Sequence, residues 1–161
     1  MATTASGSGA AMANARRGLT DLLVVHSPAR EKAFVAAGAG LARRPLMESG
    51  FLLVGPPKDP AGIAGHSPAE ALRLIADGAH RFISRGDDSG THDRERTLWR
   101  DADRRPEGEH YIESGRGMGA TLTMASQMRA YTLVDSGTFA NLLPRVELVA
   151  LVENAAALAN P

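Results

Sequence analysis

The chain has 161 residues, with 18 lysines and arginines, 18 aspartates and glutamates, and no cysteine. The balanced charge argues against a nucleic-acid or anionic membrane surface as the main partner. The lack of cysteine excludes disulfides, thiolate zinc sites, iron–sulfur clusters and cysteine nucleophiles. Hydrophobic residues make up 43% of the chain and charged residues 22%, which is typical of a soluble α/β protein.

The apolar runs have the length of strands. Those at 51–54 and 146–152 fall far short of the about 20 residues that a membrane-spanning helix needs. Residues 1–7 have neither a basic region nor an apolar region, so we expect no signal peptide in this chain. The protein is therefore expected either to work where it is made or to depend on an export signal outside this chain.

Short apolar runs alternate with amphipathic stretches, an order typical of βα folds. In chain order we expect a buried strand at 22–25, a helix over about 29–37 and a strand at 45–54. A helix should then run from the capping box Ser67-Pro68-Ala69-Glu70 to Gly78, followed by a strand at 81–84 and a charged helix over about 89–102. The last predicted elements are a strand at 111–112, a helix opened by 115–119, and strands at 131–134 and 146–152. In the charged helix, Leu98 and Trp99 should be buried, and the run 93–96 should be an exposed face with local ion pairs.

Several of these helices are entered through serine, threonine and glycine, at 6–9, 27–28, 89–91, 115–119 and 136–138. The first turn of a helix has unpaired N–H groups and a partial positive charge, so such entrances attract anions. In an open α/β sheet they gather at the carboxyl ends of the strands. For any single entrance, the simpler interpretation is that serine or threonine only caps its helix.

The segment 82–92 combines a strand end, an arginine and a helix entrance within one turn. Arg85 can form two parallel hydrogen bonds to an oxyanion, and Ser89 and Thr91 can add hydroxyl donors. Asp87 and Asp88 would repel an anion, so we expect them to cap the helix or pair with arginine. The sequence shows no convincing metal-ligand set, no dinucleotide motif and no catalytic set, so we expect no metal, no cofactor and no catalytic residue.

The order of several segments resembles the tungstate-specific substrate-binding proteins of bacterial ABC transporters. The most distinctive is Ser84-Arg85-Gly86-Asp87-Asp88-Ser89-Gly90-Thr91-His92, and the others are 19–28, 43–47, 114–121 and 131–138. The resemblance covers residues 6 to about 152. The chain departs from the family pattern at its start, where residues 1–5 run almost directly into 6–9, and at 47–50.

The resemblance implies an α/β fold of the type II periplasmic-binding-protein kind, truncated so that the second lobe is complete and the first lobe is reduced. It implies a first-lobe remnant with a βα unit at 1–45, a second-lobe α/β sandwich at 46–150, and a return segment towards the first lobe at 151–161. The implied location is the periplasm or the extracellular surface, although a cytoplasmic location stays open because we expect no signal peptide.

The implied function is capture of tungstate or molybdate, without catalysis, for uptake through an ABC transporter permease. The oxyanion-binding residues implied by the resemblance are Arg85, Ser89 and Thr91 from the second lobe and Ser8, Ser27, Thr3 and Thr4 from the first. Two alternatives stay open. One is an enzyme acting on a phosphorylated or carboxylated small molecule, with Arg85 as anion clamp and His92 or His26 as acid–base. The other is a remnant that binds no anion or that associates through its incomplete first lobe.

Overall fold

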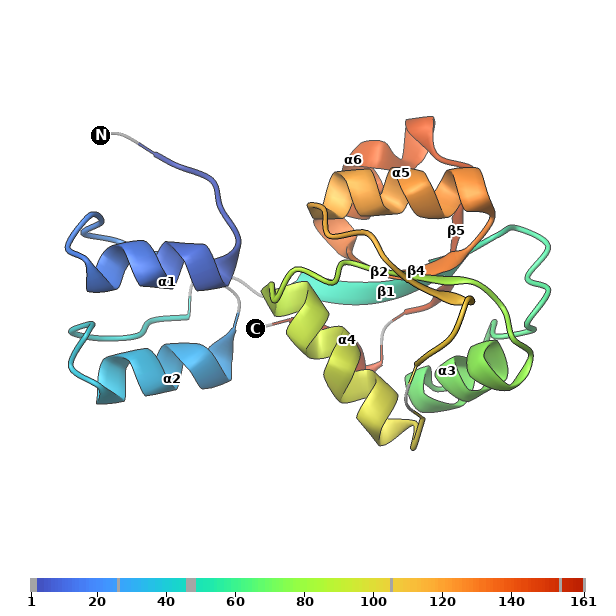
Figure 1. Ribbon diagram of the computed structural model, residues 1–161, viewed down its shortest axis with the longest axis horizontal. Coiled ribbons are helices and arrows are strands. Elements are labelled where there is room, and N and C mark those ends of the chain that lie inside the picture. The colour runs from blue at the N-terminus through green and yellow to red at the C-terminus, as the bar shows by residue number, and fades with distance from the viewer. Residues whose placement is uncertain (1–2, 26, 46–48, 105, 154, 161) are drawn as a thin grey trace. The chain divides into compact units, whose positions relative to one another are not determined.

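The computed structural model describes residues 3–25, 27–45, 49–104, 106–153 and 155–160. It divides into two compact units, residues 1–48 together with 161, and residues 49–160. Figure 1 shows both units and labels most of their helices and strands. Each unit is described by itself.

The described residues of the first unit form the helices α1 (Ser8–Arg16) and α2 (Pro28–Ala36). Met12 of α1 and Phe34 of α2 are buried. The Arg16 guanidinium lies 5.0 Å from the centre of the Phe34 ring, so a cation–π contact joins the two helices. At the start of α2, the Glu31 carboxylate accepts a hydrogen bond from the Ser27 backbone N–H at 2.8 Å and pairs with Arg43.

The strand predicted at 22–25 is wrong, because these residues form no strand. Leu22 and Val24 are 67% and 71% exposed. An apolar run becomes a buried strand only where a neighbouring backbone pairs with it and a second layer covers it. In the described part of the first unit, both elements beside the run are helices, so it has no sheet to join.

The second unit is built on one mixed sheet. Its strands are β1 (Ser49–Gly55), β2 (Phe82–Ser84), β3 (Tyr111–Glu113), β4 (Tyr131–Asp135), β5 (Val149–Val152) and β6 (Ala159–Asn160). Their order is β3-β2-β4-β1-β5, and β6 also pairs with β1. The β2 strand is parallel to β3 and β4, whereas β1 is antiparallel to β4, β5 and β6.

Helices cover both faces of this sheet. They are α3 (Pro68–Asp77), α4 (Gly90–Asp101), α5 (Met118–Met128) and α6 (Ser136–Leu142), with 3₁₀ turns at Leu143–Arg145 and Ala156–Leu158. Figure 1 shows α5 and α6 on one face and α3 and α4 on the other. The sheet therefore forms the middle layer of an α/β sandwich.

Side chains along the strands alternate between the two cores. Phe51 and Leu53 of β1 join the α3–α4 core, whereas Val54 joins the α5–α6 core. Phe82 and Ile83 of β2 divide between the two cores in the same way. Because β1, β2 and β4 are covered on both faces, most of their side chains are apolar, and the buried polar residues Ser84 and Thr132 make hydrogen bonds.

Most predicted elements of this unit are confirmed, with shifted ends. The capping box at α3 is present, with the Glu70 N–H bonding the Ser67 hydroxyl at 3.3 Å and the Ser67 N–H bonding the Glu70 carboxylate at 3.0 Å. The strand predicted at 45–54 is described from Ser49, since 46–48 lie outside the described residues. The last long strand begins at Val149 instead of 146, and residues 146–148 are irregular chain after the 3₁₀ turn at 143–145.

Candidate functional site

Three helix entrances lie at one edge of the sheet in the second unit. The parallel strands β2, β3 and β4 have their carboxyl ends at this edge, and α4, α5 and α6 begin just after them. Figure 1 shows the turns into α4 and α5 at the same end of the sheet. This edge is where open α/β sheets bind ligands, and it presents several helix N-termini.

The loop at residues 84–92, called the 84–92 loop below, holds Arg85 in a fixed position. The Arg85 side chain is 12% exposed. Its Nε donates to the Asp87 carboxylate at 3.1 Å, its Nη2 donates to the same oxygen, and its Nη1 lies 3.5 Å from the Thr91 hydroxyl. The pairing of Asp87 with Arg85, predicted from the sequence, is confirmed.

Asp87 also organises the helix entrance. Its second carboxylate oxygen accepts the Ser89 backbone N–H at 3.2 Å. These hydrogen bonds, together with the positive charge of Arg85, lower the pKa of Asp87 against the opposing effect of its burial. Asp87 is therefore ionised at neutral pH and is the internal counter-charge of Arg85.

Ser89 is the N-cap of α4. Its buried hydroxyl accepts the His92 backbone N–H at 3.3 Å. A capping hydroxyl accepts through a lone pair, so its own hydrogen can still donate, and the Ser89 side chain also hydrogen-bonds the Asp87 carboxylate. Ser89 therefore caps α4 and hydrogen-bonds Asp87, and its hydroxyl can donate to an oxyanion by turning away from Asp87.

The turn depends on two residues with positive φ, Gly86 at 59° and Asp88 at 52°. A Cβ on Gly86 would lie 2.7 Å from the Cβ of Glu113, so both conformation and space require glycine there. The backbone N–H of Asp88 donates to Nδ1 of His92 at 3.1 Å. His92 is buried and its ring holds the loop, which gives the acid–base role considered for it no support.

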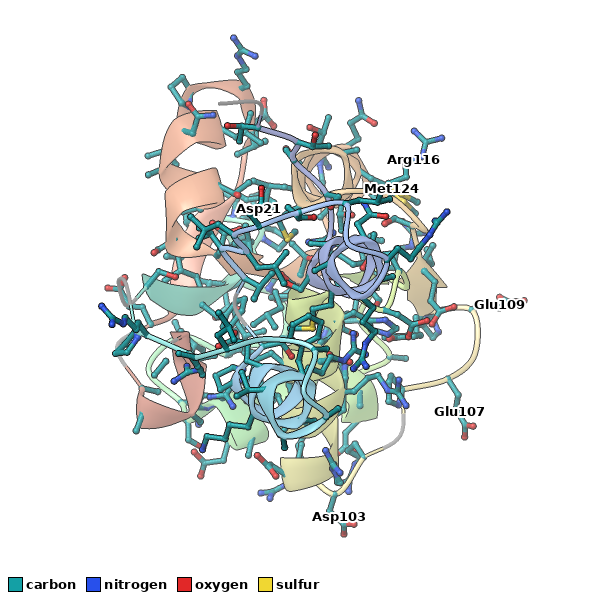
Figure 2. All side chains as sticks on the ribbon, turned by 90° about the vertical axis from the view of Figure 1, so that its left-hand side faces the viewer. Asp21, Asp103, Glu107, Glu109, Arg116 and Met124 are labelled. Atoms are coloured by element: carbon teal, nitrogen blue, oxygen red, sulfur yellow. The ribbon has the colours of Figure 1, made fainter. Side chains whose placement is uncertain are left out.

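The turn between β3 and α5 supports the 84–92 loop from the side. The Ser114 N–H donates to the Ser84 carbonyl and the Gly115 N–H donates to the Arg85 carbonyl, both at 2.9 Å. Arg116, in the same turn, is exposed and points outward (Figure 2). Arg85 is thus fixed through its backbone as well as its side chain.

A residue that the sequence analysis missed lies behind the loop. Glu95 of α4 was predicted to be exposed, and this is wrong, since it is only 2% exposed. It lies one helical turn after Thr91 and one before Leu98 and Trp99, all of them buried, so it belongs to the inner face of α4. That spacing was the signal in the sequence, but the charges on either side of Glu95 hid it.

Two hydroxyl groups satisfy the Glu95 carboxylate. Ser84 donates to Oε2 at 2.8 Å and Tyr111 donates to Oε1 at 2.7 Å. Burial raises the pKa of Glu95 to about 7, despite these hydrogen bonds. Burial and the neighbouring Glu95 charge also raise the pKa of the Tyr111 hydroxyl.

The first-unit candidates lie on different elements. Ser27 is the N-cap of α2 and Ser8 is the first residue of α1, and neither helix has a side-chain cap bond. Both serines are buried. Thr3 and Thr4 lie in exposed chain before α1. His26 falls outside the described residues.

Among the described residues, no group of three or more His, Asp or Glu side chains could hold a metal ion. The same residues include no helix with the length and apolar character needed to cross a membrane.

The family comparison agrees with the sequence resemblance. Residues 1–160 match the model of the PBP superfamily domain. The chain belongs to this family of binding-protein domains.

Two curated relatives are similar to most of the chain. The tungstate-binding protein TupA of Peptoclostridium acidaminophilum is 45% identical over 152 residues, which are 92% of this chain and 53% of that protein. A putative ABC transporter anion-binding protein of Haloferax volcanii is 45% identical over 91% of this chain and 43% of its own length. The chain therefore spans about half the length of the curated relatives it matches.

Solved structures give the same result. The structure described as the tungstate ABC transporter from Geobacter sulfurreducens has a TM-score of 0.90 and 45% identity, covering 98% of this chain and 67% of its own. The tungstate-binding protein TupA from Desulfovibrio alaskensis G20 has a TM-score of 0.81 and 41% identity, covering 98% and 65%. The predicted periplasmic-binding-protein-like fold is confirmed, with the shared part including a complete α/β sandwich.

Proposed function

We propose that this chain takes part in binding a tungstate- or molybdate-type oxyanion, with Arg85 as the principal cation of the site. The observation that carries the proposal is the 84–92 loop, where a nearly buried guanidinium lies at the N-terminus of α4. A buried arginine beside a helix entrance recognises a compact dianion through charge and through directed N–H donors.

The resting contacts leave donors for the anion. A guanidinium has five N–H groups. Asp87 and Thr91 use one from each nitrogen, so one N–H on each Nη nitrogen is left. The N–H groups of Gly90 and Thr91 in the first turn of α4 add to these, and the Ser89 hydroxyl can join them by turning from Asp87 to the anion. This set can replace much of the hydration shell of a tetrahedral oxyanion without any chemical step, so the proposed role is binding and not catalysis.

We infer a wider role from the relatives. Proteins similar to this chain bear the names tungstate-binding protein and ABC transporter anion-binding protein. We accordingly assign the chain to solute capture outside the cytoplasm, in partnership with an ABC transporter permease. The proposed division is a first-lobe part at 1–45, a second-lobe part at 46–150 and a return segment at 151–161.

From the sequence resemblance we also propose a role in anion binding for four hydroxyl residues of the first-lobe part, namely Ser8, Ser27, Thr3 and Thr4. The support for the two serines is that neither hydroxyl caps its own helix, although both residues are buried at a helix start. The two threonines stay proposals from the sequence resemblance alone.

Isothermal titration calorimetry with tungstate, molybdate and sulfate tests the proposal on the whole chain. We expect tungstate and molybdate to bind, Arg85→Ala to abolish binding, and Arg85→Lys to weaken it because lysine cannot form two parallel hydrogen bonds. Arg116→Ala is the matched control, since Arg116 is exposed near the same edge and should be dispensable. A folded wild-type chain that binds none of the three anions would contradict the proposal, as would an Arg85→Ala variant that binds like the wild type.

A further inference from the structure

The second unit contains a buried carboxylate that the proposed binding site does not use. Glu95 lies between α4, β2 and β3, and the described part of the chain contains no ion pair to it. Burying an unpaired carboxylate is costly, and the cost is relieved when the group takes up a proton. A leucine or glutamine at position 95 would avoid this cost, so the Glu95 carboxylate is a candidate for a functional role.

The groups facing Glu95 come from each of the neighbouring elements. Tyr111 and Glu113 act on it from β3, Ser84 from β2, and the indole of Trp99 from its own helix. The α3 helix and β4 meet α4 through the apolar core, and the Tyr131 hydroxyl of β4 is turned to Asp59. His92 lies one turn earlier on α4, where it accepts the Asp88 N–H. None of these groups supplies a fixed positive charge to Glu95.

A short chain of hydrogen bonds joins Glu95 to the backbone on both sides of Arg85. Ser84 donates to Glu95 at 2.8 Å, and the same hydroxyl accepts the Gly86 N–H at 3.2 Å. Arg85 lies between these two anchored residues. A change in the charge of Glu95, or in the direction of its hydrogen bond with Ser84, therefore reaches the turn that carries Arg85 through the Ser84 hydroxyl.

We propose that Glu95 is a proton-linked positioning residue of the 84–92 loop, which takes up a proton when an oxyanion binds beside Arg85. The inference rests on the proposed function of that loop. A dianion near Arg85 repels the Glu95 carboxylate, so anion binding and protonation of Glu95 favour each other, and the coupling is reciprocal. The affinity of the chain for oxyanions then rises as the pH falls.

Tungstate titrations at a series of pH values test this coupling. We expect wild-type affinity to be about three- to tenfold higher near pH 6 than near pH 8.5. Micromolar tungstate keeps the anion monomeric, and buffers without oxyanion character avoid competition. Titrations in two buffers with different ionisation enthalpies measure proton uptake on binding, which a merely structural role of Glu95 would not produce.

Glu95→Gln keeps the size of the side chain but removes its charge, and we expect it to lose both the pH dependence and the proton uptake. Tyr111→Phe provides a second variant, because it removes one hydrogen bond to the ionised carboxylate and should move the midpoint of the pH profile to a higher value. His92→Asn is the control for the other titratable group of the loop, since asparagine can also accept the Asp88 N–H.

The outcomes separate this inference from the proposed function. Tungstate binding with the same pH dependence in wild type and Glu95→Gln overturns the role of Glu95 and leaves the function standing. Wild-type affinity that is flat with pH, or that falls as the pH falls, also overturns it. The loss of the pH dependence in His92→Asn, with retention in Glu95→Gln, would assign the effect to His92. A folded wild-type chain that fails to bind tungstate at every pH refutes the function and this inference together.

Discussion

Replacing Glu95 with glutamine should change how the stability of the second unit depends on pH, even without any ligand. The unfolded chain releases the Glu95 proton near its ordinary pKa of 4.5, whereas the folded chain holds it up to about 7. Between these values the folded state binds more protons than the unfolded state, so stability falls as the pH rises. The contribution is fully present below 4.5 and is lost as the pH passes through about 7.

The displacement of this pKa from 4.5 to about 7 corresponds to a loss of about 3 kcal/mol of stability across that window. Glu95→Gln cannot lose a proton, so its free energy of unfolding should lack this decline. In the wild type the Ser84 and Tyr111 hydroxyls each donate to one oxygen of Glu95, and glutamine replaces one of these oxygens with an NH₂ group. This replacement lowers the free energy of unfolding by an amount that does not vary with pH. The quantity to compare is therefore the slope with pH and not the stability at one pH.

Urea unfolding followed by the fluorescence of Trp99 measures this slope, because the single tryptophan is buried in the α3–α4 core of the same unit. Glu107→Gln is the matched control, since Glu107 is exposed and projects from the loop after α4 (Figure 2). Carboxylates such as Asp87, whose pKa is lowered, affect wild type and variant equally and cancel in the difference. A difference between wild type and Glu95→Gln that is constant from about pH 5 to pH 8 would refute the reasoning.

Two further pairs of substitutions test the geometry of the second unit. Gly86→Ala should destabilise by about 2 kcal/mol or more and weaken anion binding, because it combines strain at positive φ with a Cβ 2.7 Å from a neighbouring Cβ. Gly62→Ala, which has φ of 66° but open space, should show only the strain of about 1 kcal/mol in the same urea titration. Ser67→Ala should cost about 1 kcal/mol by removing the cap of α3, whereas Ser67→Thr should keep most of it. Equal losses for the two glycine variants, or for the two serine variants, would contradict these assignments.

Local signals in the sequence predicted much of the second unit. The capping box at Ser67 and Glu70 fixed the start of α3 because both partners lie within one turn. Arg85 and Ser89 could be singled out for a similar reason, since a strand end, an arginine and an N-cap follow one another in the chain. Such features need no knowledge of what packs against them.

The errors concern features that depend on distant partners. The run at 22–25 has the composition of a strand, but a strand also needs a paired neighbour, which no local pattern supplies. Glu95 sits in a charged run, yet the inner face of α4 and the hydroxyls of Ser84 and Tyr111 decide its burial. Those hydroxyls lie 11 residues before it and 16 after it, so only the folded sheet brings the three groups together.

The position of β1 in the sheet has a consequence for biosynthesis. It is the first strand of the second unit to leave the ribosome, yet its neighbours β4 and β5 are among the last. The apolar segment from Phe51 to Val54 must therefore stay unpaired until β4 has been made up to Asp135, and its other edge stays open until Val152 has been made. Pairing across such sequence distances is slow, and an unpaired apolar strand is prone to aggregation until its partners are available. We therefore expect nascent chains of this protein to need protection of this apolar segment during translation.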